Sequence, residues 1–193
     1  MRRIRLLNLA NKITLSRIVL VPVIVALLYF ENRLACLLAC LGFMLAALTD
    51  VIDGHVARRS NMVTSFGKFL DPLADKVLIS SVLIMLVALG RAAAWIAIVI
   101  ICRELIITGL RAIAADEGVV IAADTFGKWK TILQGMALVP LILHYPWFGF
   151  DPVPPGQFLL YMATALTVFS GINYLRSFHR IWLGKQQSPD TVD

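Results

Sequence analysis

Residues 50–75 read D-V-I-D-G-H-V-A-R-R-S-N-M-V-T-S-F-G-K-F-L-D-P-L-A-D, and this stretch decides how the rest of the chain is interpreted. It places four aspartates, Asp50, Asp53, Asp71 and Asp75, in or beside apolar runs that are long enough to cross a bilayer. A charged side chain is costly at membrane depth, so a carboxylate there indicates a functional site. Four carboxylates within one such stretch strengthen that interpretation.

The spacing of these aspartates is helical, because residues three or four apart share one face of a helix. Two stripes result: Asp50, Asp53, Gly54 and Ala57 form the first, and Gly67, Asp71 and Asp75 form the second. If the stripes face each other, the carboxylates cannot all stay ionised without compensation. Mg²⁺ and Mn²⁺ favour carboxylate oxygen, and Mg²⁺ usually binds together with a substrate phosphate. The pattern therefore favours a metal and phosphate site over the alternative of solvated aspartates beside a cytoplasmic loop.

The composition indicates an all-α integral membrane protein. Apolar residues make up 59% of the chain, and the mean hydropathy is +0.81. Lipid tolerates only helices and closed barrels, and these apolar runs lack the alternation of barrel strands. We expect a single membrane domain over residues 1–193, with a short amphipathic interfacial segment at 1–13 and a disordered tail at 185–193. The six expected transmembrane helices are 14–30, 34–58, 69–90, 92–115, 125–145 and 157–178.

Basic residues are distributed unevenly between the two ends of these expected spans. Of the 18 Lys and Arg residues, only Arg33 and Arg91 fall at one end, and the connection 144–156 has none. The positive-inside rule then places both termini and the aspartate stretch on the cytoplasmic side of a cell's inner membrane.

The aspartate stretch matches D-x2-D-G-x2-A-R-x8-G-x3-D-x3-D at every fixed position, including Arg58. This pattern resembles the signature of the CDP-alcohol phosphotransferases, and the size and apolar character of the whole chain suit that family. The resemblance implies that Asp50, Asp53, Asp71 and Asp75 hold Mg²⁺ or Mn²⁺. It also implies that Asp75 is the catalytic base. Gly54, Ala57, Arg58 and Gly67 would then contact the CDP-diacylglycerol donor.

Three segments outside this stretch resemble one branch of the family, whose members use sn-glycerol 3-phosphate as acceptor. The N-terminal pattern N-x2-T-x2-R implies that Asn11, Thr14 and Arg17 approach the donor; the alternative for Arg17 is snorkelling to the interface. Residues 102–111, C-R-E-L-I-I-T-G-L-R, and the G-K-x-K-T pattern at 127–131 carry further basic groups. Four of these suit the acceptor's phosphate: Arg103, Arg111, Lys128 and Lys130.

Two structural alternatives remain open for these basic residues. Arg103 or Glu104 could form a structural salt bridge between spans. In the functional alternative, Glu104 orients an arginine in an anion pocket, and Glu104, Thr108 and Arg111 share one stripe. The lysines could reflect positive-inside placement alone.

The resemblance implies transfer of the phosphatidyl group of CDP-diacylglycerol to sn-glycerol 3-phosphate, releasing CMP. The expected partners are these two substrates and the lipid bilayer, with no nucleic acid; a homodimer is left open. One alternative is the same chemistry with inositol phosphate, serine or phosphatidylglycerol as acceptor. A second is a divalent-cation transporter, which would also place carboxylates at membrane depth. The aspartates lie at the ends of spans rather than midway, which favours the enzyme. A non-catalytic scaffold is a third alternative.

Overall fold

A computed structural model describes residues 9–60, 65–116 and 125–186, and within them the side chains of residues 14–49, 73–116, 127 and 129–180. The regular structure of these ranges is helical, apart from an isolated bridge between Trp147 and Phe150. The helices are α1 (Leu9–Tyr29), α2 (Arg33–Ser60), α3 (Ser65–Ala88), α4 (Ala94–Asp116), α5 (Thr125–Leu143) and α6 (Val153–Gln186).

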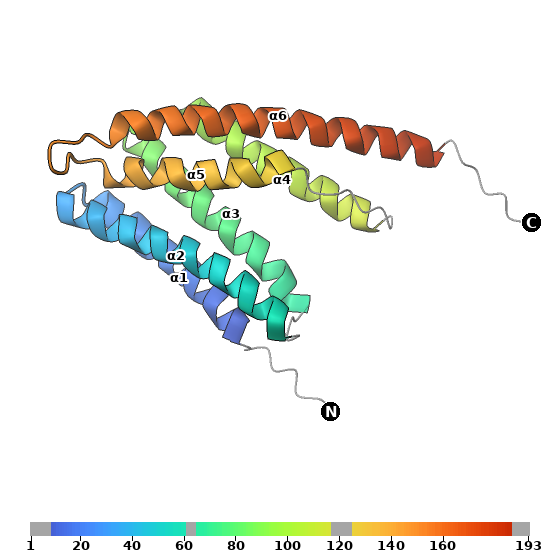
Figure 1. Cartoon of the computed structure of the whole chain (residues 1–193), viewed down its shortest axis with the longest axis horizontal. Coiled ribbons are helices and arrows are strands. Elements are labelled where there is room, and N and C mark those ends of the chain that lie inside the picture. Colours follow the sequence, from blue (N-terminus) through green and yellow to red (C-terminus); the bar gives the residue numbers. More distant parts are fainter. Residues whose placement is uncertain (1–8, 61–64, 117–124, 187–193) are drawn as a thin grey trace, which may run out of the picture.

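Consecutive helices run in opposite directions, so the start of α1 and the end of α6 lie at the same end of the molecule (Figure 1). Helix α1 packs on α2 and α3, while α6 packs on α4 and α5. Contacts of α2 with α5 and of α3 with α4 and α5 join these groups. We call the end that holds the end of α2 and the starts of α3 and α5 the site end. The opposite end, which holds the turns at 30–32 and 89–93 and the loop 144–152, is the far end.

The apolar core occupies the half of the bundle toward the far end. Each helix contributes to it from the half of its length that is nearer those turns, and side chains such as Phe43, Leu86 and Leu141 are at most 1% exposed. This location leaves the site end free to carry polar and charged side chains without disrupting the packed apolar layer. The fully buried large side chains are Ile24, Leu28, Phe43, Leu78, Leu83, Leu86, Ile96, Ile100, Leu138, Leu141, Ile142 and Leu160.

The turn between α3 and α4 buries a cation at the far end. Gly90 adopts a φ of 69°, which suits glycine because it has no side chain to clash in the left-handed region. The Arg91 N–H then bonds the Leu86 carbonyl at 2.8 Å, which closes α3 with a Schellman-type turn. The Arg91 side chain is only 4% exposed and donates to the Ile142 carbonyl at 3.3 Å. Arg91 lies at the predicted end of the spans, and its side chain ties this turn to α5.

Polar side chains of the loops define where two helices begin. Asn32 accepts a hydrogen bond from the Ala35 N–H at 2.8 Å at the start of α2. Asp151 accepts one from the Val153 N–H at 3.0 Å at the start of α6. Between them, the Arg33 side chain donates to the Pro146 carbonyl and lies 5.0 Å from the centre of the Trp147 ring. These contacts connect the α1–α2 turn to the α5–α6 loop.

The predicted helices are confirmed in order and approximate position, with differences at their ends. Helix α3 begins at Ser65, earlier than the expected residue 69, and continues through Pro72. Helix α6 is longer than expected at both ends and includes residues 185–186 of the expected tail. Helix α1 begins at Leu9, so residues 9–13 of the expected interfacial segment continue into it. Residues 1–8 and 187–193 lie outside the described residues.

Within the described ranges, one helix segment, Val153–Arg180, has both the length and the apolar composition to cross a bilayer. Shorter apolar segments are Thr14–Tyr29, Arg33–Thr49 and Trp129–Leu143. Helices α3 and α4 carry charged side chains within their apolar runs. Six spanning helices therefore stay a prediction.

The close packing of α5 on α6 generates a stability prediction at Gly156. A Cβ added there would lie 2.9 Å from Leu141 Cγ and 3.0 Å from Pro140 Cγ, so Gly156→Ala forces the buried Leu141 to move. We expect a loss of about 1–3 kcal/mol in the free energy of unfolding, measured by thermal denaturation in detergent. Gly109→Ala is the matched control, because its Cβ meets no atom within 4 Å. Equal melting temperatures for the two variants would contradict the packing described here.

Candidate active site

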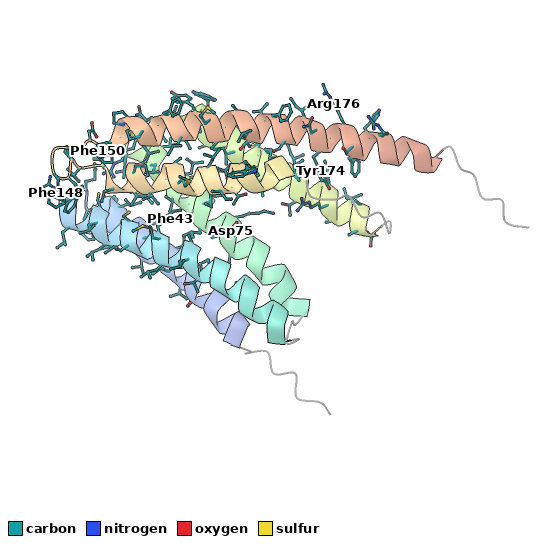
Figure 2. The ribbon with its side chains drawn as sticks, in the orientation of Figure 1. Phe43, Asp75, Phe148, Phe150, Tyr174 and Arg176 are labelled. Atoms are coloured by element: carbon teal, nitrogen blue, oxygen red, sulfur yellow. The ribbon has the colours of Figure 1, made fainter. Side chains whose placement is uncertain are left out.

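Asp75 lies on α3 between the two groups of helices and is partly buried (Figure 2). It lines an open cavity of about 410 Å³ between α2, α3 and α5. Apart from Asp75 and Thr131, the lining is apolar or glycine and includes Phe43, Met44 and Ile132. The cavity therefore joins a carboxylate at one point to a surface that suits hydrocarbon, which is the chemistry of a lipid with a reactive head group.

The Glu104 carboxylate on α4 binds two cations. Arg103 Nη1 donates to Glu104 Oε1 at 3.1 Å, and Lys130 of α5 forms an ion pair with the same oxygen. Lys130 is only 3% exposed, and a buried ammonium needs such a partner. The salt bridge between spans that the sequence left open is therefore present, between Glu104 and Lys130. Glu104 also orients Arg103, as the functional alternative required.

A second set of contacts connects α3 to α4 beside this ion pair. Lys76 donates to the Thr108 hydroxyl, and that hydroxyl donates to the Glu104 carbonyl at 2.6 Å. Arg111, one turn further along α4, is exposed and lies 5.7 Å from the centre of the buried Tyr174 ring of α6. Lys76, Thr108 and Arg111 also line a groove of about 700 Å³ between α3 and α4.

We call Lys76, Arg103, Arg111 and Lys130 the cation cluster. Its members act on one another electrostatically: Lys76 with Arg103, Arg111 and Lys130, and Arg103 with both Arg111 and Lys130. Asp75 acts on Lys76 and Lys130 with the opposite sign. Like charges held this close repel one another, and an anion placed among them relieves the repulsion. The geometry thus fits a phosphate group that lies beside Asp75.

Two residues predicted to approach the donor, Thr14 and Arg17, are buried on α1, at 1% and 2% exposed. Snorkelling requires the Arg17 guanidinium to reach water, so its burial contradicts that alternative. Their role toward a donor stays a prediction.

The remaining predicted site residues have side chains outside the described part of the structure. Their backbones place the aspartates on α2 and α3 and Lys128 on α5, at the site end. These residues are Asn11, Asp50, Asp53, Gly54, Ala57, Arg58, Gly67, Asp71 and Lys128. Among the side chains that are described, no group of three or more His, Cys, Asp or Glu residues could hold a metal ion. That finding does not test the expected ligand set, because Asp75 is its only described member.

Two residues of the site, Ser170 and Gly171 on α6, were not predicted. Ser170 accepts a hydrogen bond from Arg103 Nη2 at 2.8 Å, and a Cβ at Gly171 would lie 3.2 Å from Arg103 Cγ. A serine followed by a glycine is an ordinary packing feature of apolar helices, so the sequence alone gives no signal for these two residues. Only their contacts with Arg103 identify them as part of the site.

An apolar helical bundle in which a carboxylate borders both a cation cluster and a lipid-compatible cavity fits a membrane-associated enzyme that acts on phosphorylated lipids. Comparison with known proteins agrees with this class. A family model described as CDP-alcohol phosphatidyltransferase matches residues 7–169.

Three relatives illustrate the similarity. A CDP-diacylglycerol–glycerol-3-phosphate 3-phosphatidyltransferase of Bacillus subtilis (strain 168) is 45% identical over 187 residues, which cover 91% of this chain and 95% of that protein. A protein of the same name from Rickettsia typhi is 40% identical over 173 residues, covering 88% and 96%. A cardiolipin synthase (CMP-forming) of Oryza sativa subsp. japonica is 33% identical over 201 residues, covering 93% of this chain and 60% of that protein.

The chain belongs to the CDP-alcohol phosphatidyltransferase family, which confirms the family that the aspartate motif indicated. The family is one of membrane-associated enzymes, so the transporter and the scaffold are not supported.

Proposed function

We propose that this protein transfers the phosphatidyl group of CDP-diacylglycerol to sn-glycerol 3-phosphate, giving phosphatidylglycerophosphate and CMP. The observation that carries the proposal is the cation cluster next to Asp75, because an acceptor that already bears a phosphate needs such a site. The names of the relatives from Bacillus subtilis and Rickettsia typhi support the same reaction. Serine bears no phosphate and has no net charge, so these cations argue against it as the acceptor.

The reaction exchanges one phosphorus–oxygen bond for another. The acceptor's hydroxyl oxygen attacks the phosphorus that carries the diacylglycerol, and the bond from that phosphorus to the CMP oxygen breaks. CMP leaves with the electron pair, and the hydroxyl proton passes to the Asp75 carboxylate. Asp75 suits this role because it is partly buried on a helix and borders the cavity.

We propose that Asp50, Asp53, Asp71 and Asp75 hold Mg²⁺ or Mn²⁺. The donor set supports this, because it consists of carboxylates, the oxygen ligands that these hard cations prefer. A bound metal would neutralise charge on the diphosphate and on the departing CMP. The protein's own contribution to catalysis is to position both substrates, as is usual for phosphoryl transfer.

The cavity beside Asp75 is the proposed site for the acyl chains of the donor. Its apolar lining continues along α2, α3 and α5 from Asp75 toward the far-end core. A donor whose chains lie there has its head group at the carboxylate end. Arg103, Arg111, Lys128 and Lys130 then remain for the acceptor's phosphate, with charge-assisted hydrogen bonds.

We propose that the helices cross the inner membrane with the site end in the cytoplasm. Large apolar side chains are exposed at helical spacing on several helices, for example Leu15, Val19 and Val23 of α1. Exposed apolar faces of this extent suit contact with lipid. The asymmetry of Lys and Arg supports the direction.

Acceptor choice is tested with purified protein, labelled CDP-diacylglycerol and a panel of acceptors. We expect product with sn-glycerol 3-phosphate and none with serine, inositol phosphate or phosphatidylglycerol. Arg111→Ala should raise the KM for sn-glycerol 3-phosphate about ten- to a hundredfold, from a lost contact of roughly 1.5–3 kcal/mol. Its KM for the donor should stay within twofold of the wild-type value.

Two further variants are compared with Arg111→Ala. Arg176→Ala removes another exposed cation from the site half of α6 and should leave both KM values unchanged. Asp75→Asn should abolish turnover while donor binding is kept. If Arg111→Ala weakens donor and acceptor equally, the acceptor pocket is wrong; if another alcohol is the preferred substrate, the acceptor assignment is wrong and the family remains.

Metal dependence is tested by removing divalent cations. We expect activity to disappear with a chelator and to return with Mg²⁺ or Mn²⁺, because the clustered carboxylates and the diphosphate would otherwise repel each other. Direct titration of Mn²⁺ by electron paramagnetic resonance should show weaker binding to Asp71→Asn than to the wild type. Full activity in metal-free buffer would refute the metal site.

Sidedness is tested by labelling single cysteines with a membrane-impermeant reagent in intact cells, after the native cysteines are replaced by alanine. Phe148→Cys, at a fully exposed position of the far-end loop, should react, whereas Ser188→Cys should be protected until the cells are opened. The opposite pattern would reverse the proposed orientation.

A further inference from the structure

Helix α6 contacts Arg103 through two consecutive residues. Ser170, only 1% exposed, accepts a hydrogen bond from Arg103 Nη2 at 2.8 Å. At the next position, a Cβ on Gly171 would lie 3.2 Å from Arg103 Cγ and 3.6 Å from Arg103 Nε. The Arg103 side chain therefore passes closely over α6 at a point where a side chain is absent.

The Ser170 hydroxyl has a defined direction. It lies 3.3 Å from the Thr167 carbonyl, to which it donates its only proton, so its lone pair faces Arg103. Thr167 is itself held, because its hydroxyl donates to the Ala163 carbonyl at 2.6 Å and accepts from Gln134 Nε2 of α5 at 3.0 Å. Helix α6 thus provides a fixed acceptor for α4 and a second one for α5.

The Arg103 guanidinium is held at both of its terminal nitrogens. Glu104 accepts from Nη1, and Ser170 accepts from Nη2. Each terminal nitrogen carries two hydrogens, so one N–H on each remains available. Free N–H donors on a guanidinium whose plane is fixed are suited to bind phosphate through charge-assisted hydrogen bonds.

We infer that Ser170 and Gly171 are positioning residues for the acceptor's phosphate. Ser170 fixes the plane of the Arg103 guanidinium, and Gly171 leaves the room that this plane requires. A guanidinium that is already held loses less freedom when the phosphate binds, so acceptor affinity is higher. The inference rests on the proposed function, because it assigns Arg103 to the acceptor.

The test compares Ser170→Ala and Gly171→Ala with the wild type and with Arg103→Ala. Each α6 variant should raise the KM for sn-glycerol 3-phosphate about tenfold, corresponding to 1.4 kcal/mol, with the donor KM and kcat within twofold. In an Arg103→Ala background the same substitutions should have no further effect, since residues that act through one partner are not additive. If the two residues had a purely structural role, their substitution would still raise the acceptor KM in the Arg103→Ala background.

Two matched controls lie nearby. Thr164→Val removes another buried α6 hydroxyl, which bonds only the Leu160 carbonyl of its own helix among the bonds described. Gly109→Ala adds a Cβ where no atom lies within 4 Å. Both should leave the acceptor KM unchanged, and melting temperatures measured in detergent should show that all variants are folded.

The outcomes separate the two proposals. If Arg103→Ala raises the acceptor KM but neither α6 variant does, or if they raise donor and acceptor KM together, the positioning role is wrong and the proposed function stands. If Arg103→Ala itself leaves the acceptor KM unchanged, the assignment of Arg103 fails and the inference falls with it. If Ser170→Ala does not fold, the acceptor KM of Gly171→Ala decides whether the positioning role holds. If neither variant folds, the role of both residues is structural and the inference is overturned.

Discussion

The Glu104 carboxylate is the contact on which the site end of this bundle depends. It pairs with the buried Lys130 of α5 and with Arg103 of its own helix, so it offsets two cations within an apolar environment. A buried charge without a partner is very costly, and removing one member of such a pair leaves the other uncompensated. In the part of this end that the structure describes, the cation cluster still outnumbers Asp75 and Glu104. That excess is the physical reason why the site suits an anionic substrate.

Stability and chemistry are divided between the two ends of the molecule. The fully buried apolar side chains and the bonds of Arg33 and Arg91 join the helices at the far end. The helices diverge toward the site end (Figure 1). The described polar contacts of Glu104, Lys130 and Arg103 join them there. A rigid far half allows the site half to hold charged groups and a cavity, both of which weaken packing. Helix α6 serves both halves, because Gly156 packs on α5 in one and Ser170 contacts Arg103 in the other.

Family membership and site geometry constrain different parts of the proposal. The relatives match this chain over nearly its whole length, so they support the chemistry that is common to the family. One of them is a cardiolipin synthase, so the common chemistry alone does not determine the acceptor. The acceptor is argued instead from Arg103, Arg111 and Lys130, which the structure gathers from two helices. This is why the decisive variants lie in the cation cluster rather than in the aspartate motif.

The sequence by itself determined the helical class, the order of the helices and the family. These follow from local properties: apolar runs of sufficient length, and carboxylates whose fixed spacing is readable without any fold. It also predicted that Arg103, Arg111 and Lys130 belong to one site. Only the tertiary structure decided which partner each cation has. Glu104 binds Lys130 across helices, Arg91 is buried and tied to α5, and Ser170 with Gly171 contacts Arg103. Such pairings depend on helix rotation and on the distance between helices, which residues far apart in the chain set jointly and no local spacing encodes.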